Sequence, residues 1–246
     1  MATSGRATWD EVLLATLVPA ILSLVMEGYL VCTVVPLKLW LREPLESYYK
    51  VSVAIASYGP VAWSVMHVVF AYLVVKLMTS EGESVRDYLR VPRGWRGIAL
   101  DALTALLLLA FNYVLFNVLF PWVLTLTMPA GFLDAFLRAV RDVPAHFKVY
   151  ALTVTCFTAG LCEEIIWRAY GITRMERLLG GRTNLAVLVS AVFFGIWHGL
   201  SVYGLLCFLA GLAYGFVFAR IRRITPLFVA HWVGDVVAFK ALYFAP

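Results

Sequence analysis

The sequence predicts an all-α fold: a polytopic membrane bundle of about seven transmembrane helices, with an amphipathic helix at the membrane interface. Two observations support this prediction. Of the 246 residues, 62% are hydrophobic and 14% are charged, and the mean hydropathy is +0.85, whereas soluble domains contain about 45–50% apolar and about 25% charged residues. The apolar residues form long continuous runs, without the roughly ten-residue alternating segments of a membrane β-barrel.

Seven apolar runs are long enough, or nearly so, to cross a bilayer, which requires about 20 mainly apolar residues per helix. They lie at residues 11–36, 51–78, 97–126, 149–172, 185–200, 203–220 and 225–243. The fifth and sixth runs are short, and we expect a tight connection near Leu200–Val202 between them. No repeat or linker interrupts the chain, so we expect one domain over residues 1–246.

Residues 127–148, between the third and fourth runs, carry apolar side chains at helical spacing with two arginines on the opposite side. The apolar residues are Leu133, Phe136, Leu137 and Val140, and the arginines are Arg138 and Arg141. This pattern indicates an amphipathic helix that lies in the membrane interface.

The distribution of Lys and Arg predicts the orientation. Loops on the N-terminal side contain eleven basic residues: Arg6, Arg86, Arg90, Arg93, Arg96, Arg174, Arg177, Arg182, Arg220, Arg222 and Arg223. Loops on the other side contain six: Lys38, Arg42, Lys50, Arg138, Arg141 and Lys148. Because cytoplasmic loops carry the excess of Lys and Arg, we expect a cytoplasmic N-terminus and an external C-terminus. The basic residues are spread over several loops, so the net charge of +5 does not indicate nucleic-acid binding.

Ionisable residues inside a membrane span are costly, about 2.5–3.5 kcal/mol each on insertion scales, and by default indicate a functional site. The fourth span contains Glu163, Glu164 and Arg168. Glu164 and Arg168 are four residues apart and can pair on one helix face. Glu163 lies about 100° around an α-helix from Glu164 and therefore needs a different partner.

Two later spans supply candidates for that partner. Phe194 and His198 share one face of the fifth span, and His231 and Asp235 share one face of the seventh, each pair at i,i+4 spacing. At a rise of about 1.5 Å per residue, Glu163 and these three ionisable groups can reach one cavity in the cytoplasmic half of the membrane.

Other polar residues in the spans are expected to have supporting roles. Glu27 and His67 can pair with each other or line an access path, and neither is placed in the catalytic set. Asn112 and Asn117 can form interhelical hydrogen bonds. Small residues on one face of the sixth span favour close helix packing: Gly204, Gly211 and Gly215.

The three motifs occur in order on successive spans: Glu163-Glu164-x-x-x-Arg168, Phe194-x-x-x-His198 and His231-x-x-x-Asp235. In this they resemble the CPBP family of CAAX proteases and bacteriocin-processing enzymes, in which EExxxR, FxxxH and HxxxN/D lie on membrane helices. The resemblance covers about residues 149–240. Within this family the chain resembles the type II CAAX prenyl endopeptidases. The resemblance implies an integral membrane protease, in the plasma membrane if the source is prokaryotic, whose substrate is a membrane-associated or prenylated peptide or protein. Asp235 stands where the prenyl endopeptidases usually have Asn, and an ionised Asp cannot donate a hydrogen bond to an oxyanion.

Two mechanisms use these residues. In the first, Glu163, assisted by His198, activates a water molecule, and His231 helps to hold the oxyanion. Arg168 pairs with Glu164 and keeps that carboxylate ionised. In the second, Glu163, His198 and His231 bind Zn²⁺ with a fourth position open to water, and Glu164 is the base. The absence of a local HExxH-type ligand pair favours the first mechanism, which needs no cofactor.

Two other functional classes remain as alternatives. The same Glu, His and Asp side chains could relay protons in a proton-coupled transporter, although inverted repeats and broken helices in matching halves are absent. A non-catalytic membrane scaffold or immunity factor would not require the complete set of motifs.

Overall fold

The computed structural model describes residues 8–129 and 131–244, which form helices and no strands. In chain order the elements are α1 (Trp9–Val34), α2 (Leu37–Arg42), α3 (Pro44–Ser80), η1 (Val85–Asp87), α4 (Trp95–Tyr113), η2 (Val114–Leu119), α5 (Phe120–Thr127), α6 (Phe132–Arg141), α7 (Ala145–Tyr150), η3 (Ala151–Thr155), α8 (Cys156–Thr158), η4 (Ala159–Ile172), α9 (Thr173–Leu178), α10 (Thr183–Trp197), α11 (Val202–Ile221) and α12 (Thr225–Phe244). Here η1 is a 3₁₀ turn, whereas η2, η3 and η4 are π-helical. The prediction of an all-α polytopic bundle is confirmed.

Within the described residues, six continuous helices are long and apolar enough to cross a membrane. They are Trp9–Val34, Pro44–Ser80, Trp95–Thr127, Ala145–Leu178, Val202–Ile221 and Thr225–Phe244. The third joins α4, η2 and α5, and the fourth joins α7 to α9. The predicted fifth span is α10, which has 15 residues. At about 1.5 Å per residue it is about 22 Å long and therefore shorter than the roughly 30 Å hydrocarbon core.

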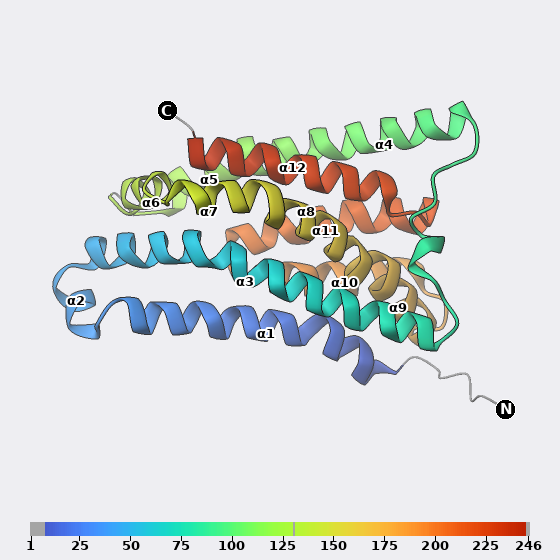
Figure 1. Ribbon diagram of the computed structural model, residues 1–246, viewed down its shortest axis with the longest axis horizontal. Helices are drawn as coiled ribbons and strands as arrows, with labels where there is room; N and C mark the ends of the chain where they lie inside the picture. Colours follow the sequence, from blue (N-terminus) through green and yellow to red (C-terminus); the bar gives the residue numbers. More distant parts are fainter. Residues whose placement is uncertain (1–7, 130, 245–246) are drawn as a thin grey trace.

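The long helices lie side by side along the longest axis of the molecule, with the start of α1 and the end of α12 at opposite ends (Figure 1). The short helix α6 is viewed almost along its own axis, so it runs across one end of the bundle (Figure 1). It packs on α3 and α12 and buries Ala135, Ala139 and Val140, while Arg138 and Arg141 are exposed. This helix is the predicted amphipathic segment.

The π-helix η4 occupies the centre of the bundle. Thirteen of its 14 residues are buried, and it contacts α1, α3, α8, α9, α10, α11 and α12. A helix that is buried on all sides belongs to a core rather than to a lipid-facing surface. Most π-helical segments in proteins are single-turn bulges, frequently at functional sites. Because π-helical segments are frequent at functional sites, η4 is a candidate to carry one.

Glycines allow the helices around η4 to approach closely. A Cβ atom on Gly160 would lie 2.9 Å from the backbone nitrogen of Trp232, so α12 packs directly against η4. The predicted close packing along α11 is also confirmed, because Cβ atoms on Gly211 and Gly215 would lie 3.1 Å and 2.7 Å from side chains of α10.

A tight connection joins α10 and α11, as predicted. Gly199 has a φ angle of +93°, a conformation that suits glycine. The hydroxyl of Ser201 then caps α11 by accepting a hydrogen bond from the backbone N–H of Gly204 at 3.2 Å.

The basic loops on the N-terminal side meet at one end of the bundle, apart from Arg6, which lies outside the described residues. Arg174 is fully buried there and lies 2.9 Å from both Glu81 and Glu83 at the end of α3. These ion pairs explain why the fourth helix continues to Leu178, beyond the predicted end at residue 172: the charged residues that suggested a loop are paired inside the fold.

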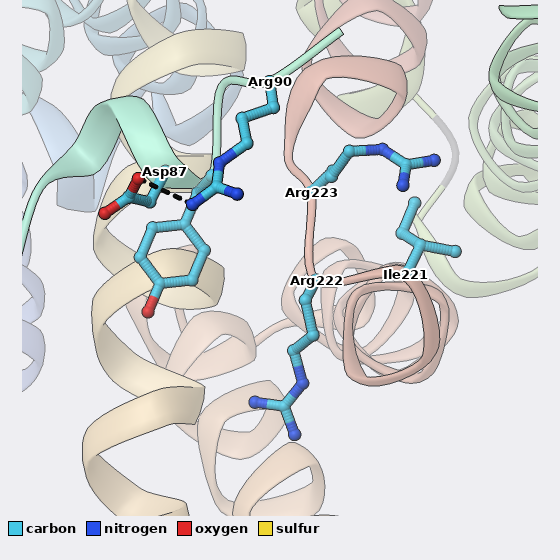
Figure 2. A pocket seen from close by; sticks show the side chains of 6 residues that line it. Asp87, Arg90, Ile221, Arg222 and Arg223 are labelled. Carbon is cyan, nitrogen blue, oxygen red and sulfur yellow. Dashed lines mark hydrogen bonds and ion pairs between the residues drawn. The ribbon is translucent and has the colours of Figure 1, made fainter. Parts of the chain in front are cut away.

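A hollow of about 410 Å³ at this end is lined by Asp87, Tyr88, Arg90, Ile221, Arg222 and Arg223. Figure 2 shows Arg90 turned towards Asp87, 2.7 Å away, while the guanidinium groups of Arg222 and Arg223 point away from each other. Arg222 instead lies 2.7 Å from Glu176, and Arg223 pairs with Asp101. Arg90 is therefore paired within its own loop, and Arg222 and Arg223 are paired with carboxylates of the helices α9 and α4.

Candidate functional site

The two neighbouring glutamates of η4 both point into the bundle. The exposed fractions are 2% for Glu163 and 0% for Glu164. A buried carboxylate is costly unless it is paired and hydrogen-bonded, so the partners of these two side chains define the site.

Glu164 has two partners on one oxygen. Its Oε1 lies 3.1 Å from Nη1 of Arg168, which confirms the predicted i,i+4 pair, and 2.9 Å from Nδ1 of His231 on α12. The Arg168 guanidinium is stacked between the rings of Phe194, at 4.7 Å, and Tyr214, at 5.3 Å. Arg168 is thereby held in place by packing and charge together, and it fixes Glu164.

The bond to Glu164 determines the orientation of His231. A carboxylate oxygen only accepts hydrogen bonds, so Nδ1 of His231 carries a proton and donates it. Nε2 then faces two other carboxylates, with Oε2 of Glu163 and Oδ2 of Asp235 each 3.7 Å away. These distances exceed hydrogen-bond length. A water molecule or a substrate oxygen can therefore bridge these groups.

Glu163 is held from a third helix. Its Oε1 accepts a hydrogen bond from Nε2 of His67 on α3 at 2.9 Å, and the His67 side chain is 4% exposed. Oε2 of Glu163 finds no hydrogen-bond donor among the described residues. Of the two roles expected for His67, the pair with Glu27 is therefore wrong, because His67 binds Glu163. His67 thus belongs to a cluster in which the sequence analysis did not place it.

The predicted span 185–200 placed His198 inside a helix. In the structure His198 instead lies one residue beyond the end of α10. Its Nδ1 donates to the carbonyl oxygen of Phe194 at 2.8 Å, because a carbonyl can only accept. Nε2 is left free to accept a proton. The Phe194 ring lies 4.6 Å from the His198 ring and 6.5 Å from the His231 ring, between the two histidines. Electrostatic interactions link His198 to Glu163.

Further polar residues lie behind the cluster. The amide of Asn112 on α4 donates to the hydroxyl of Tyr214 on α11 at 2.7 Å, which confirms the predicted interhelical hydrogen bond. The Tyr214 ring in turn lies 5.8 Å from the His231 ring. Glu27 is half-buried on α1, and Asn117 is half-buried in η2. Tyr214 was missed by the sequence reasoning because a tyrosine in an apolar span has no distinguishing pattern.

A zinc ion held by Glu163, His198 and His231 stays a prediction. Among the residues that the structure describes, no three His, Cys, Asp or Glu side chains are grouped as metal ligands. The bonds from His67 to Oε1 of Glu163 and from Nδ1 of His231 to Glu164 leave Oε2 of Glu163 and Nε2 of His231 without a partner at hydrogen-bond distance in the described part of the chain. A histidine that binds a metal usually donates its other N–H to a carboxylate in this way. The mechanism proposed below needs no metal ion.

The structure thus brings Glu163, Glu164, His231 and Asp235, from the first and third motifs, together inside a polytopic helical bundle. Residues 144–237 match the family model described as Type II CAAX prenyl endopeptidase Rce1-like. The match confirms the predicted resemblance to the CPBP family of CAAX proteases and extends over nearly the predicted range. It covers all three motifs and leaves out α3, which carries His67. No curated protein and no solved structure matches the chain.

Proposed function

We propose that this protein is an intramembrane endopeptidase that hydrolyses a peptide bond with a water molecule activated by Glu163. The observation that carries the proposal is the free Oε2 of Glu163, buried in the bundle and facing Nε2 of His231 at 3.7 Å. A general base must have an oxygen within reach of a water proton, and removing such a group typically costs about 10²–10⁴-fold in rate.

The first step requires two acceptors for one water molecule. Oε2 of Glu163 takes the proton, and Nε2 of His198 accepts the second O–H, because its Nδ1 proton is engaged by the Phe194 carbonyl. The hydroxide then attacks the carbonyl carbon of the scissile peptide bond. When the tetrahedral intermediate collapses, the C–N bond breaks and Glu163 gives its proton to the leaving nitrogen. The products are a carboxylic acid and an amine, and transfer of the acid proton to the amine gives a carboxylate and an ammonium group.

The oxyanion is stabilised by His231. With a proton on Nδ1 donated to Glu164, a second proton on Nε2 gives an imidazolium that can donate to the oxyanion. Asp235, whose Oδ2 lies 3.7 Å from Nε2, favours this charged form but cannot itself donate. His231 therefore donates to the oxyanion without the help of an amide, which an asparagine at position 235 would provide.

The substrate is a membrane-associated peptide or protein, and a prenylated one suits the surface. A largely apolar hollow of about 600 Å³ lies on α10 and α11 beside the turn that follows His198. Its lining includes Ile196, Leu200, Val202 and Phe208. We propose that the protein is oriented with its arginine-rich end in the cytoplasm, in keeping with the excess of basic residues there.

Peptidase assays in lipid nanodiscs test the proposal. Wild type, Glu163→Gln and His198→Ala are compared on prenylated and unprenylated peptides, and Glu27→Gln is the matched control, an intramembrane carboxylate outside the cluster. We expect cleavage by wild type and Glu27→Gln and about a 10²–10⁴-fold loss in the other two variants. Activity that survives Glu163→Gln contradicts the assignment. Proton-coupled uptake into vesicles, without peptide cleavage, would indicate the transporter class instead.

A further inference from the structure

We propose that His67 is a positioning residue for Glu163: its hydrogen bond selects which carboxylate oxygen receives the water proton. The inference rests on the proposed function and adds a residue from α3, outside the segment that matches the family model. His67 does not face the position between Glu163 and His231, because it binds the other oxygen of Glu163.

The hydrogen bond has a defined direction. Oε1 of Glu163 can only accept, so the proton lies on Nε2 of His67, 2.9 Å away. Nδ1 of His67 is buried without a hydrogen-bond partner among the described residues. One side of the ring is therefore committed to Glu163, and no other described protein group competes for the ring.

Aromatic packing fixes the plane of the His67 ring. It is stacked on Trp197, with ring centroids 5.8 Å apart and an interplanar angle of 10°. Trp197 packs edge-on against Trp167 of η4, with centroids 5.6 Å apart at 88°. His67 thus contacts η4, the helix that carries Glu163, in two ways: through the stacked tryptophans and through its hydrogen bond to Glu163.

This arrangement has a consequence for the reaction. While Oε1 holds the His67 proton, only Oε2 can accept the proton from water. After the transfer, the same bond keeps the new proton on Oε2, on the side of Glu163 that faces His231 and the substrate. Without a donor at Oε1, the carboxyl group can rotate and present either oxygen, so fewer encounters are productive.

Three substitutions separate hydrogen bonding from packing. His67→Gln places an amide N–H four bonds from Cα, as in Nε2 of histidine, and can donate to Glu163. His67→Asn places its amide three bonds from Cα, at the position of the unpartnered Nδ1, and cannot reach. His67→Phe keeps the ring stacked on Trp197 but has no donor.

We expect kcat to fall about 10–100-fold in His67→Asn and His67→Phe, with KM within about twofold of wild type because His67 does not touch the substrate. His67→Gln is expected to restore kcat to within about fivefold of wild type. Thermal unfolding is measured on all three variants. Equal loss of kcat in all three, in proportion to lost stability, would show a structural role and overturn the proposal.

A measurement independent of activity distinguishes this inference from the proposed function. The chain contains four histidines, so ¹⁵N-histidine labelling in nanodiscs gives few signals, and the signal lost in His67→Gln belongs to His67. We expect a proton on Nε2 whose resonance shifts in Glu163→Gln. A His67 signal with the proton on Nδ1, or one unaffected by Glu163→Gln, refutes the bond even if peptides are cleaved. The expected signal in a protein that cleaves no peptide supports the bond and refutes the protease.

Discussion

Replacing Gly160 by alanine should disturb the site from outside it. The new Cβ would lie 2.9 Å from the backbone nitrogen of Trp232, whereas ordinary van der Waals contact begins at 3.4 Å. Since backbone atoms cannot rotate away, α12 must retreat from η4 by about 0.5 Å. The hydrogen bond from His231 to Glu164 would lengthen from 2.9 Å to about 3.4 Å, beyond the usual N–H···O range of about 2.7–3.2 Å.

We therefore expect Gly160→Ala to lower kcat about 10-fold or more, because a 1 Å misplacement can cost about 10²-fold. Overpacking should also cost about 1–3 kcal/mol of stability. The assay is steady-state peptide cleavage with thermal unfolding measured on the same samples. Gly28→Ala is the control, because a Cβ at this helical glycine of α1 meets nothing within 4 Å. Wild-type kcat in Gly160→Ala would refute the claim that the approach of α12 to η4 sets the position of His231.

Three other outcomes are expected. Asp235→Asn should keep at least about a tenth of wild-type kcat, because an amide can donate to the oxyanion; a loss above about 100-fold would show that the negative charge itself is required. Chelators should leave peptide cleavage unchanged in purified protein with little bound metal, whereas loss of cleavage that is restored by Zn²⁺ would establish the metal mechanism. Arg174→Met should lower stability by about 2 kcal/mol, less than for a fully buried pair because Glu81 and Glu83 are partly exposed; kcat measured well below the unfolding temperature should not change.

The sequence predicted the positions of the helices well because helices that cross a bilayer need long apolar runs, which are visible in the sequence. Each predicted apolar run overlaps a helix, and the turn between α10 and α11 lies where the glycine and serine indicated. The π-helical geometry of η4 could not be predicted, since it depends on neighbours that pack on every side. The end of the fourth helix was placed too early because Arg174 is neutralised by Glu81 and Glu83, residues remote in sequence.

The site was predictable where its residues form a local pattern and not where they stand alone. Glu164 and Arg168 are one helical turn apart, and their pairing followed from spacing. His67 is a single histidine in an apolar helix, and nothing near it in the sequence indicates which later helix it meets. An ionisable side chain in a membrane span is costly. This cost gave a reason to expect a partner for His67, but it does not identify the partner.

The order of partners along the chain matters for membrane insertion. The helix α3 leaves the ribosome well before η4, so His67, Glu81 and Glu83 are already in place when the fourth helix is inserted. That helix then brings in Glu163, which meets His67, and Arg174, which meets the two glutamates. The charged residues of this segment thus find partners on α3 and in the turn that follows it. We therefore expect insertion of the fourth helix to depend on the N-terminal half of the protein.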